Sequence, residues 1–353
     1  MASKAEKHAS DGASEQGKTK KHKTAPTGDE ELKELPRAKE ELTPNIDTAP
    51  FYMHEYVNKD VAIRTPLLKI DFTGKSAFQD VKVIETAAFG KTLMLDGKTQ
   101  SAKFDEFIYH ESLVHPALLT HPNPKTVYVG GGGEMATVRE ILRHKSVEKV
   151  VMCDIDKVVC DLSRKYLPEW GEDAWEDPRL ELFYDDAKKN LENYPSKFDI
   201  IIMDIADPIE AGPGIALYTQ EFYKGLKDKL NPGGIFVTQS GPADLLCVEE
   251  CFTTINRTLV ASFDYVFPYS SHVPSFACVW GFNMGFNKHP SLPTAVNTIS
   301  IEDTDAKIAK RLTFKPGKSL RYYDGQTHLH MTNPPLWLRN KCKEEKRLMT
   351  IAN

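Results

Sequence analysis

Hydrophobic and polar residues are patterned differently in successive parts of this 353-residue chain. Residues 1–45 contain almost no large apolar side chains, so they cannot bury enough surface to offset the entropy of ordering, and we expect a disordered charged tail. From residue 51 to 100 the runs LLKIDF, FQDVKVIET and TLMLDG alternate with turn signals, which predicts a small N-terminal antiparallel β-domain over residues 46–115. Apolar residues at helical spacing predict a helix over residues 105–119.

The central part of the chain alternates strand-like and helix-like segments. We identify strands in KTVYVGGGG, EKVVMCDID, RLELFYDD, FDIIIMDIADP and GGIFVTQSG, and helices in ATVREILRH, VVCDLSRKYL and YTQEFYKGLKDKL. Apolar runs such as IIIMDI are typical of strands buried on both faces. The alternation predicts the α/β class, with a Rossmann-like, methyltransferase-type doubly wound sheet over residues 116–300. The polar, mixed residues 301–353 predict a partly ordered C-terminal extension.

Composition narrows the classes of function. The chain has 45 Lys and Arg against 50 Asp and Glu, so its formal charge of −5 does not favour a nucleic-acid or membrane-surface partner. The sequence has neither a run of about 18 apolar residues nor a signal-peptide core, which predicts a cytoplasmic protein. The six cysteines form no CxxC pair and lie mostly in apolar runs, as buried free thiols do. The His and Cys spacings predict no metal site.

A glycine-rich turn is the first indication of a ligand. The first strand of the alternating part ends in four consecutive glycines, residues 130–133, which include Gly131 and are followed by Glu134. Consecutive glycines let the backbone turn sharply and approach a ligand before the next helix begins. The GxGxxG spacing that seats a pyrophosphate is missing, and Glu134 would repel a phosphate, so a dinucleotide fits poorly. A simple tight turn is the alternative.

Carboxylates follow the next strands. Asp154 ends the second strand, where a carboxylate can accept hydrogen bonds from both hydroxyls of a ribose, and Asp186 follows the third, where it could accept from an adenine amine. Each could instead cap a helix. The fourth strand ends in Asp204 and Asp207; Asp207 before a proline could start a turn, whereas Asp204 ends an apolar run, and a buried carboxylate needs a partner. Together these residues favour a nucleoside ligand.

At these motifs the chain resembles the aminopropyltransferase family, the spermidine, spermine and thermospermine synthases. The resemblance covers about residues 52–285, through LDGKTQSAKFDEFIYHESLVHPAL, HPNPKTVYVGGGGE, FDIIIMDIADP, LYTQEFY and HVPSF. The combination of DGxxQ, DEFxYxE and DxxDP is much more specific than a glycine loop. The resemblance implies a small-molecule polyamine substrate, no cofactor, and a homodimer or homotetramer, because the N-terminal β-domain resembles the family's dimerising element.

The resemblance also implies a cosubstrate, decarboxylated S-adenosylmethionine. Matching positions assign its binding to the glycine loop, Gln79, Glu134, Asp154 and the adjacent Asp186 and Ala187. Glu134 would meet the terminal amine of the aminopropyl arm. Its charge would discriminate against the carboxylate of S-adenosylmethionine, the donor of an ordinary methyltransferase.

The same resemblance assigns the acceptor side. Asp204 matches the family's general base, which takes a proton as the acceptor nitrogen attacks the methylene beside the sulfonium, and Asp207 matches the neighbour that holds the acceptor amine. A base is needed because an aliphatic amine is almost fully protonated at neutral pH. Tyr109 matches a tyrosine that orients this amine. His110 and Phe276 are similar to the thermospermine branch, which favours spermidine as acceptor and thermospermine as product.

Two departures leave alternatives open. Met135 and Ala136 replace the small residues usual after the acidic position, and Cys278 stands where the thermospermine branch has an acid. A spermidine or spermine synthase is therefore an alternative, and so is a polyamine N-methyltransferase on the same scaffold, although Glu134 and Asp204 argue against methyl transfer. A scaffold or sensor that binds a polyamine without turnover is the non-enzymatic alternative.

Overall fold

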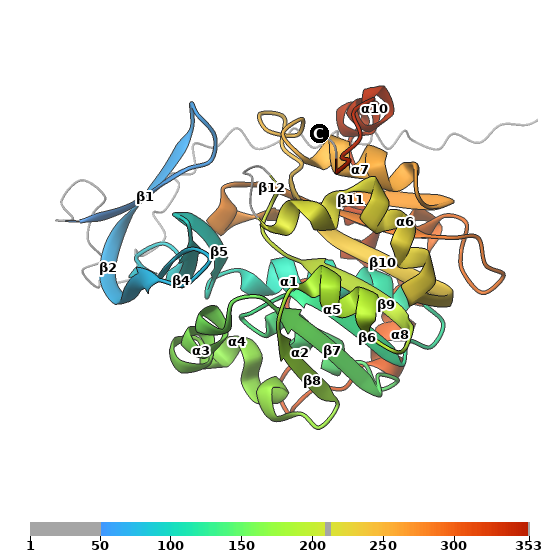
Figure 1. Ribbon diagram of the computed structural model, residues 1–353, viewed down its shortest axis with the longest axis horizontal. Coiled ribbons are helices and arrows are strands. Elements are labelled where there is room, and N and C mark those ends of the chain that lie inside the picture. The colour runs from blue at the N-terminus through green and yellow to red at the C-terminus, as the bar shows by residue number, and fades with distance from the viewer. Residues whose placement is uncertain (1–50, 209–212, 352–353) are drawn as a thin grey trace, which may run out of the picture. The chain divides into compact units, whose positions relative to one another are not determined.

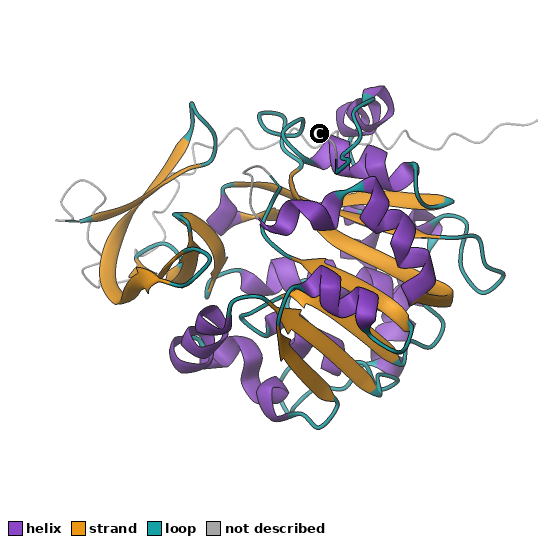
Figure 2. Ribbon diagram, viewed as in Figure 1, coloured by secondary structure: helices purple, strands orange, loops and turns teal. Residues whose placement is uncertain are grey.

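The computed structural model describes residues 51–208 and 213–351 (Figure 1). The tail expected over residues 1–45 lies outside the described residues. The described part contains a five-stranded and a seven-stranded sheet, and helices cover the larger one (Figure 2). In these two ranges we find no helix with the length and apolar character that a membrane crossing requires.

The N-terminal sheet is an antiparallel meander, as the sequence predicts. Its strand order follows the chain, and the side chains of β3 alternate, with Val81 and Val83 buried and Lys82 exposed. Val81, Val83 and Leu93 pack in one core with Trp170 of the short helix α4 (Pro168–Gly171). The strands are β1 (Tyr52–Tyr56), β2 (Ala62–Lys75), β3 (Asp80–Thr86), β4 (Gly90–Leu95) and β5 (Lys98–Ala102).

The larger sheet has the order β11-β12-β10-β9-β6-β7-β8. The five strands from β10 to β8 are parallel, whereas β11 and β12 are antiparallel. The chain moves outward from β6 through β7 and β8 and then continues on the other side with β9 and β10, so the order reverses between β6 and β9. Doubly wound sheets bind ligands at this switch point. The strands are β6 (Thr126–Gly131), β7 (Lys149–Asp154), β8 (Leu180–Tyr184), β9 (Phe198–Asp204), β10 (Leu230–Pro242), β11 (Tyr265–Val273) and β12 (Cys278–Phe286).

The parallel strands fill a core on each face of the sheet. Ile200 and Ile202 of β9 belong to the core under α1 and α2, and Ile201 and Met203 to the core under α5, α6 and α7. All four side chains are fully buried, which explains the unbroken apolar run and confirms the expected Rossmann-like layers. The helices are α1 (Glu106–Thr120), α2 (Ala136–Leu142), α3 (Lys157–Tyr166), α4 (Pro168–Gly171), α5 (Ala187–Asn193), α6 (Gln220–Lys229) and α7 (Phe252–Val260).

Helix α1 is buried on nearly every side although many of its residues are polar. Residues 109–120 are all buried, so their polar groups need partners inside the protein. Pro116 has no N–H for the carbonyl of Ser112, and the hydroxyl of Tyr269 donates to that carbonyl at 3.1 Å instead. The domain boundary expected at residue 115 stays a prediction; α1 runs across it.

The last part of the chain is more regular than the sequence pattern suggests. The Glu111 carboxylate in α1 accepts hydrogen bonds from the backbone N–H groups of Arg321, Tyr322 and Tyr323 at 2.8–2.9 Å. This buried carboxylate ties residues 321–323 to α1, and Leu312, Tyr323 and Met331 of the same part of the chain are buried in the core around α1. The elements here are α8 (Ile301–Arg311), α9 (Gly325–Met331) and α10 (Leu336–Glu344), and the 3-10 turns of the chain are η1 (Glu172–Glu176), η2 (Pro213–Tyr218), η3 (Pro274–Phe276) and η4 (Val296–Thr298).

Candidate active site

The glycine loop lies at the switch point, against the end of β9. Gly131 pairs with Asp204, and the N–H of Gly132 donates to the Asp204 carbonyl at 3.0 Å. The φ angles of Gly131 and Gly132 are 81° and 79°. A Cβ on Gly131 would lie 2.1 Å from the Asp204 carbonyl oxygen, and one on Gly133 would lie 2.9 Å from Oδ2 of Asp154. The glycines therefore let strand ends and their carboxylates approach one another closely.

Hydroxyls from two helices hold the side chain of Asp204. Tyr109 of α1 donates to Oδ1 at 2.6 Å, and Thr137 of α2 donates to Oδ2 at 2.5 Å. Burial and the charge of Glu134 raise the pKa of Asp204, against the opposing effects of His110 and the two hydroxyls. A carboxylate with a raised pKa is suited to take up a proton. Sequence reasoning missed Thr137, whose only signal is its place in the first turn after the glycine loop.

Glu134 and His110 lie side by side, as expected for residues of one site. His110 Nε2 is 3.2 Å from Oε1 of Glu134, and the imidazole is completely buried whereas the Glu134 side chain is 12% exposed. Burial opposes a charge on the ring, but hydrogen bonds to Glu106 and Glu134 outweigh burial and raise the pKa of His110 to about 10. The shift therefore favours the imidazolium form of His110 at neutral pH.

Asp154, at the end of β7, lies close enough to Glu134 and Asp204 to feel their charges. Burial raises its pKa to about 7, and the charges of Asp156, Glu134 and Asp204 add to this shift. Oδ1 of Asp154 accepts the N–H of Asp156 at 2.8 Å. Asp154 is not a helix cap, because Asp156 caps α3 by accepting two of its backbone N–H groups.

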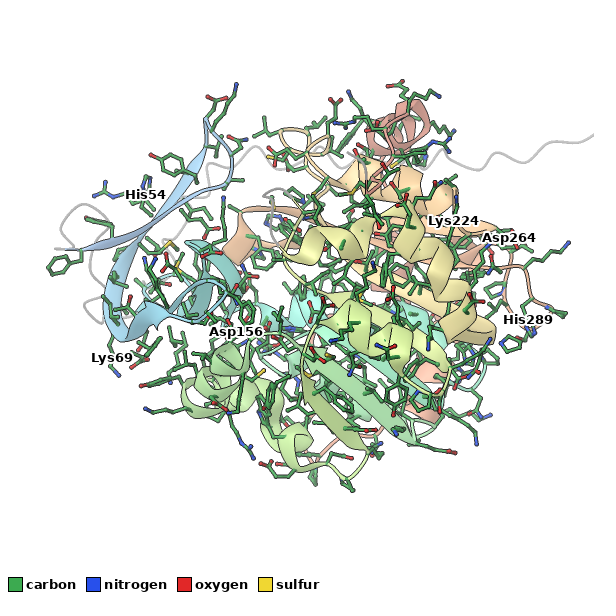
Figure 3. The ribbon with its side chains drawn as sticks, in the orientation of Figure 1. His54, Lys69, Asp156, Lys224, Asp264 and His289 are labelled. Atoms are coloured by element: carbon green, nitrogen blue, oxygen red, sulfur yellow. The ribbon has the colours of Figure 1, made fainter. Side chains whose placement is uncertain are left out.

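Gln79 connects the N-terminal sheet to this carboxylate group. Its Nε2 donates to Oδ2 of Asp156 at 2.9 Å, and the Ser76 hydroxyl donates to the same oxygen at 2.6 Å. Figure 3 labels Asp156, which lies between the two sheets. Gln79 therefore reaches the neighbourhood of Asp154 through Asp156, a residue that sequence reasoning missed although it belongs to the same CDID run.

Asp186 and Ala187 follow β8, the outermost parallel strand. Asp186 is exposed and caps α5, accepting from the backbone N–H groups of Lys188 and Lys189 at 2.8 and 3.1 Å. The helix-cap alternative thus holds for this residue. The Ala187 carbonyl accepts the hydroxyl of Tyr128 at 2.7 Å, which fixes the start of α5 against β6. Adenine binding by this pair stays a prediction.

Asp207 lies just beyond the end of β9 and has a different partner from Asp204. Nε2 of Gln239, on β10, donates to its Oδ1 at 2.9 Å. Burial raises the pKa of Asp207 to about 6, and the hydrogen bond from Gln239 partly opposes this shift. Gly241 has a φ of 74°, and a Cβ there would lie 3.2 Å from Oδ2 of Asp207. Gln239, a polar residue late in an apolar strand, was not among the predicted residues.

Phe276 lies beside Tyr109. Their ring centroids are 5.8 Å apart, and the ring of Trp280 is 4.7 Å from that of Phe276. The N–H of Ser275 donates to Oδ2 of Asp105 at 2.6 Å, which ties η3 to the start of α1. The structure therefore places an apolar ring next to the tyrosine that contacts Asp204.

Cys278, the departure from the expected acid, is buried. Burial raises the pKa of its thiol far above the ordinary value, and the charges of Asp244, Asp207 and Glu55 add to this effect. Burial and the negative charges of these three carboxylates, which come from different parts of the fold, therefore keep the thiol neutral.

These contacts define an acidic site at the carboxyl edge of the sheet. The charges of Glu134 and Asp204 both act on Asp154, and Asp207 lies three residues beyond Asp204 with Gln239 as its own partner. In residues 51–208 and 213–351, His110 is the only cationic side chain paired with any of the four. Neighbouring carboxylates disfavour one another's charge, and a cationic ligand relieves this repulsion. Among the described residues, no group of three His, Cys, Asp or Glu side chains is arranged to hold a metal ion. Fold and site define a Rossmann-like protein with an acidic site at the switch point of its sheet.

Comparison with known sequences and structures identifies the family of this chain. The spermine/spermidine synthase domain matches residues 106–295, and the spermidine synthase tetramerisation domain matches residues 52–103. The chain is 47% identical over 262 residues to thermospermine synthase ACAULIS5 of Arabidopsis thaliana, covering 74% of this chain and 75% of that protein. It is 40% identical over 308 residues to a polyamine aminopropyltransferase of Aeropyrum pernix, covering 85% and 93%. The crystal structure of a spermidine synthase in complex with the transition state analogue AdoDATO has a TM-score of 0.75 at 28% identity, covering 88% of this chain and 100% of that one. The chain belongs to the spermine/spermidine synthase family and is an aminopropyltransferase.

Proposed function

We propose that the protein transfers the aminopropyl group of decarboxylated S-adenosylmethionine to spermidine, giving thermospermine and methylthioadenosine. The observation that carries this proposal is Asp204, held by two hydroxyls at the switch point beside Glu134. A primary amine of spermidine attacks the methylene beside the sulfonium, and the C–S bond breaks with its electron pair passing to sulfur. Asp204 takes the proton that the amine loses.

The donor lies at the end of the site formed by the glycine loop and β7. Glu134 binds the ammonium of the aminopropyl arm, and Asp154 accepts from the ribose hydroxyls. Asp186 and Ala187 contact the adenine, and Gln79 supports this end through Asp156. The raised pKa of Asp154 supports the assignment, because a buried carboxylate gains most from a ligand that donates hydrogen bonds to it. No other cofactor takes part.

The acceptor lies at the other end. Tyr109 orients the attacking amine beside Asp204, and Asp207 holds a second amine of the same polyamine. His110 and the Phe276 ring shape the pocket in which spermidine binds. The similarity to thermospermine synthase ACAULIS5 supports spermidine as the acceptor.

The protein forms a homodimer or homotetramer through its N-terminal sheet and acts in the cytoplasm. The match of residues 52–103 to a tetramerisation domain supports this assembly. Exposed apolar side chains on that sheet also support it, because Leu68 and Ile70 of β2 are 47% and 55% exposed.

An assay with separated products tests the proposal. The purified full chain is incubated with decarboxylated S-adenosylmethionine and putrescine, spermidine or spermine, and chromatography that resolves spermine from thermospermine identifies the products. We expect methylthioadenosine and thermospermine with spermidine only.

Each other outcome overturns a defined part of the proposal. Spermine or spermidine as the product removes the thermospermine assignment but keeps aminopropyl transfer. Methylated polyamine formed from S-adenosylmethionine, without an aminopropyl product, replaces the reaction. Polyamine binding in a calorimeter without turnover would make the protein a sensor or scaffold.

A further inference from the structure

Both ring nitrogens of His110 face acceptors. Nδ1 is 2.7 Å from the carbonyl oxygen of Glu106 and 2.9 Å from its Oε2, and Nε2 is 3.2 Å from Oε1 of Glu134. The Glu106 carbonyl oxygen only accepts hydrogen bonds, so Nδ1 carries a proton, and Nε2 carries one as well when Glu134 is an ionised carboxylate. The contacts therefore fit an imidazolium buried between two ionised carboxylates.

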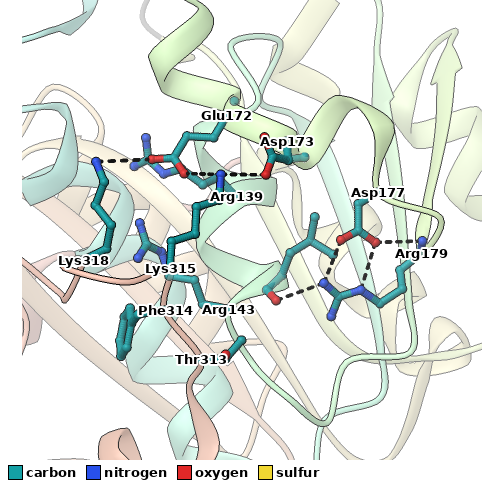
Figure 4. Close-up of a pocket in the computed structure, with 13 residues that line it drawn as sticks. Arg139, Arg143, Glu172, Asp173, Asp177, Arg179, Thr313, Phe314, Lys315 and Lys318 are labelled. Carbon is teal, nitrogen blue, oxygen red and sulfur yellow. Dashed lines mark hydrogen bonds and ion pairs between the residues drawn. The ribbon is translucent and has the colours of Figure 1, made fainter.

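Glu106 is held in turn by Arg139. Nη2 of Arg139 is 2.9 Å from Oε2 and Nη1 is 3.3 Å from Oε1, so the guanidinium contacts both carboxylate oxygens. Arg139 also bonds Glu140 at 2.9 Å and the Trp170 carbonyl at 2.9 Å. Figure 4 shows Arg139 at the wall of a cavity of about 260 Å³, whose lining includes none of the four carboxylates of the acidic site. These bonds hold the guanidinium from several directions, and Arg139 and His110 together lower the pKa of Glu106 against the effect of burial.

Charges therefore alternate along a buried line that ends at the active site. Glu134, His110, Glu106, Arg139 and Glu140 carry negative and positive charge in turn. Beyond Glu134 the alternation stops, because the next carboxylate, Asp204, has only hydroxyl partners.

The proposed reaction needs Glu134 and Asp204 ionised at the same time, although each charge disfavours the other. We propose that Glu106 and Arg139 are positioning residues that lock His110 as an imidazolium, and that this buried cation keeps Glu134 and Asp204 ionised together. The groups that face His110 are Glu106 and Tyr109 on its own helix, Glu134 on the glycine loop and Asp204 on β9. Of these, only the carboxylates carry charge, and all three favour the charged ring. This inference rests on the proposed function for its consequence, but the state of His110 is independent of it.

Histidine NMR of the ligand-free full chain tests the state of His110 directly. The His110 resonance is identified by its absence in His110→Gln. We expect an imidazolium signal that persists to about pH 9, and in Glu106→Gln a transition that moves down by at least one pH unit because one of the two charge partners is lost. A wild-type transition near the ordinary value of about 6.5 overturns the proposal whether or not the enzyme is active.

The pH dependence of kcat then tests whether the charged His110 keeps Glu134 and Asp204 ionised together. We expect the acidic limb of the kcat profile to move up by about one pH unit in His110→Gln, because the cation beside Glu134 and Asp204 is lost. The shift should be smaller in Glu106→Gln, whose histidine keeps Glu134 as a charge partner. The double variant should resemble His110→Gln alone, because Glu106 acts through the histidine. Glu106→Asp should restore most of the wild-type profile, and Glu302→Gln, at an exposed site on α8, serves as the matched control. An equal loss of activity at every pH, with additive single effects, would assign Glu106 a structural role only.

Discussion

Two carboxylates at the end of β9 lie three residues apart in the sequence and in different surroundings. Asp204 accepts from the hydroxyls of Tyr109 and Thr137, whereas Asp207 accepts from the amide of Gln239. A hydroxyl can donate or accept, so it can keep its contact when the carboxylate becomes protonated; an amide NH₂ can only donate. The surroundings thus suit Asp204 to exchange a proton and Asp207 to stay an anion that holds a cation.

The strongest way to break this comparison is Asp204→Asn. We expect kcat to fall by about 10²- to 10⁴-fold, because an amide cannot take the proton of the attacking amine. The amide can still accept from one hydroxyl, so the thermal unfolding midpoint should stay close to that of the wild type. Steady-state assay of methylthioadenosine release measures the effect. Near-normal turnover would remove Asp204 from the role of base.

Asp207→Asn should act on the acceptor instead. Loss of a charged partner for the ammonium costs about 1.5–3 kcal/mol, so kcat/KM for spermidine should fall by roughly 10- to 100-fold, mainly through KM. Calorimetric binding of the donor should be unchanged. If kcat falls as far as in Asp204→Asn while KM stays constant, the division of roles between the two carboxylates is wrong.

Thr137→Val tests whether the hydroxyl of Thr137 is needed for the role of Asp204. Removing one hydroxyl leaves Oδ2 without its partner at 2.5 Å, and we expect kcat to fall about tenfold. Thr298→Val is the matched control, because the Thr298 hydroxyl donates to the exposed Ala295 carbonyl at 2.8 Å, far along the chain from the site. Equal effects in the two variants would show that Thr137 does not support Asp204.

Much of this site follows from the sequence because strand ends in a parallel sheet converge. The glycine run, the apolar strands and the carboxylates after them place Glu134, Asp154 and Asp204 on one edge before any contact is known. The register confirms this placement by pairing Gly131 with Asp204 and by bringing β7 alongside β6.

The side-chain partners could not be read from the sequence. Thr137, Gln239 and Asp156 contact their partners across different elements, and residue types this common carry no pattern that marks a contact. Helix α5 was missed because only Ala187 and Leu191 of its seven residues are buried, too few to produce a helical period. The antiparallel strands β11 and β12 were also missed, because they do not follow the alternation of strands and helices from which the other strands were predicted.

The smallest expected effect is on folding stability. Asp207 and His110 should contribute to it in different pH ranges. The pKa of Asp207 in the fold, about 6, exceeds its ordinary value, so the folded state holds an extra proton and stability is lost as the pH rises toward 6. The pKa of His110, beside Glu134 and Asp204, is raised to about 10, so its contribution is complete below about pH 6.5 and is lost as the pH rises through 10. Asp207 and the His110 group beside Asp204 therefore lose their contributions to stability in different pH windows.

Thermal unfolding of the ligand-free protein across this range measures both windows. Asp207→Asn should flatten the dependence of the midpoint between about pH 4 and 6, and His110→Gln should flatten it between about pH 7 and 10, each by a few degrees. The difference between variant and wild type isolates each group, because Asp154 and the other titrating residues are common to both. Suppose instead that Asp207→Asn and His110→Gln changed the unfolding midpoint in the same pH window. Asp204 and Asp207 would then share one electrostatic environment, and only their hydrogen-bond donors would distinguish them.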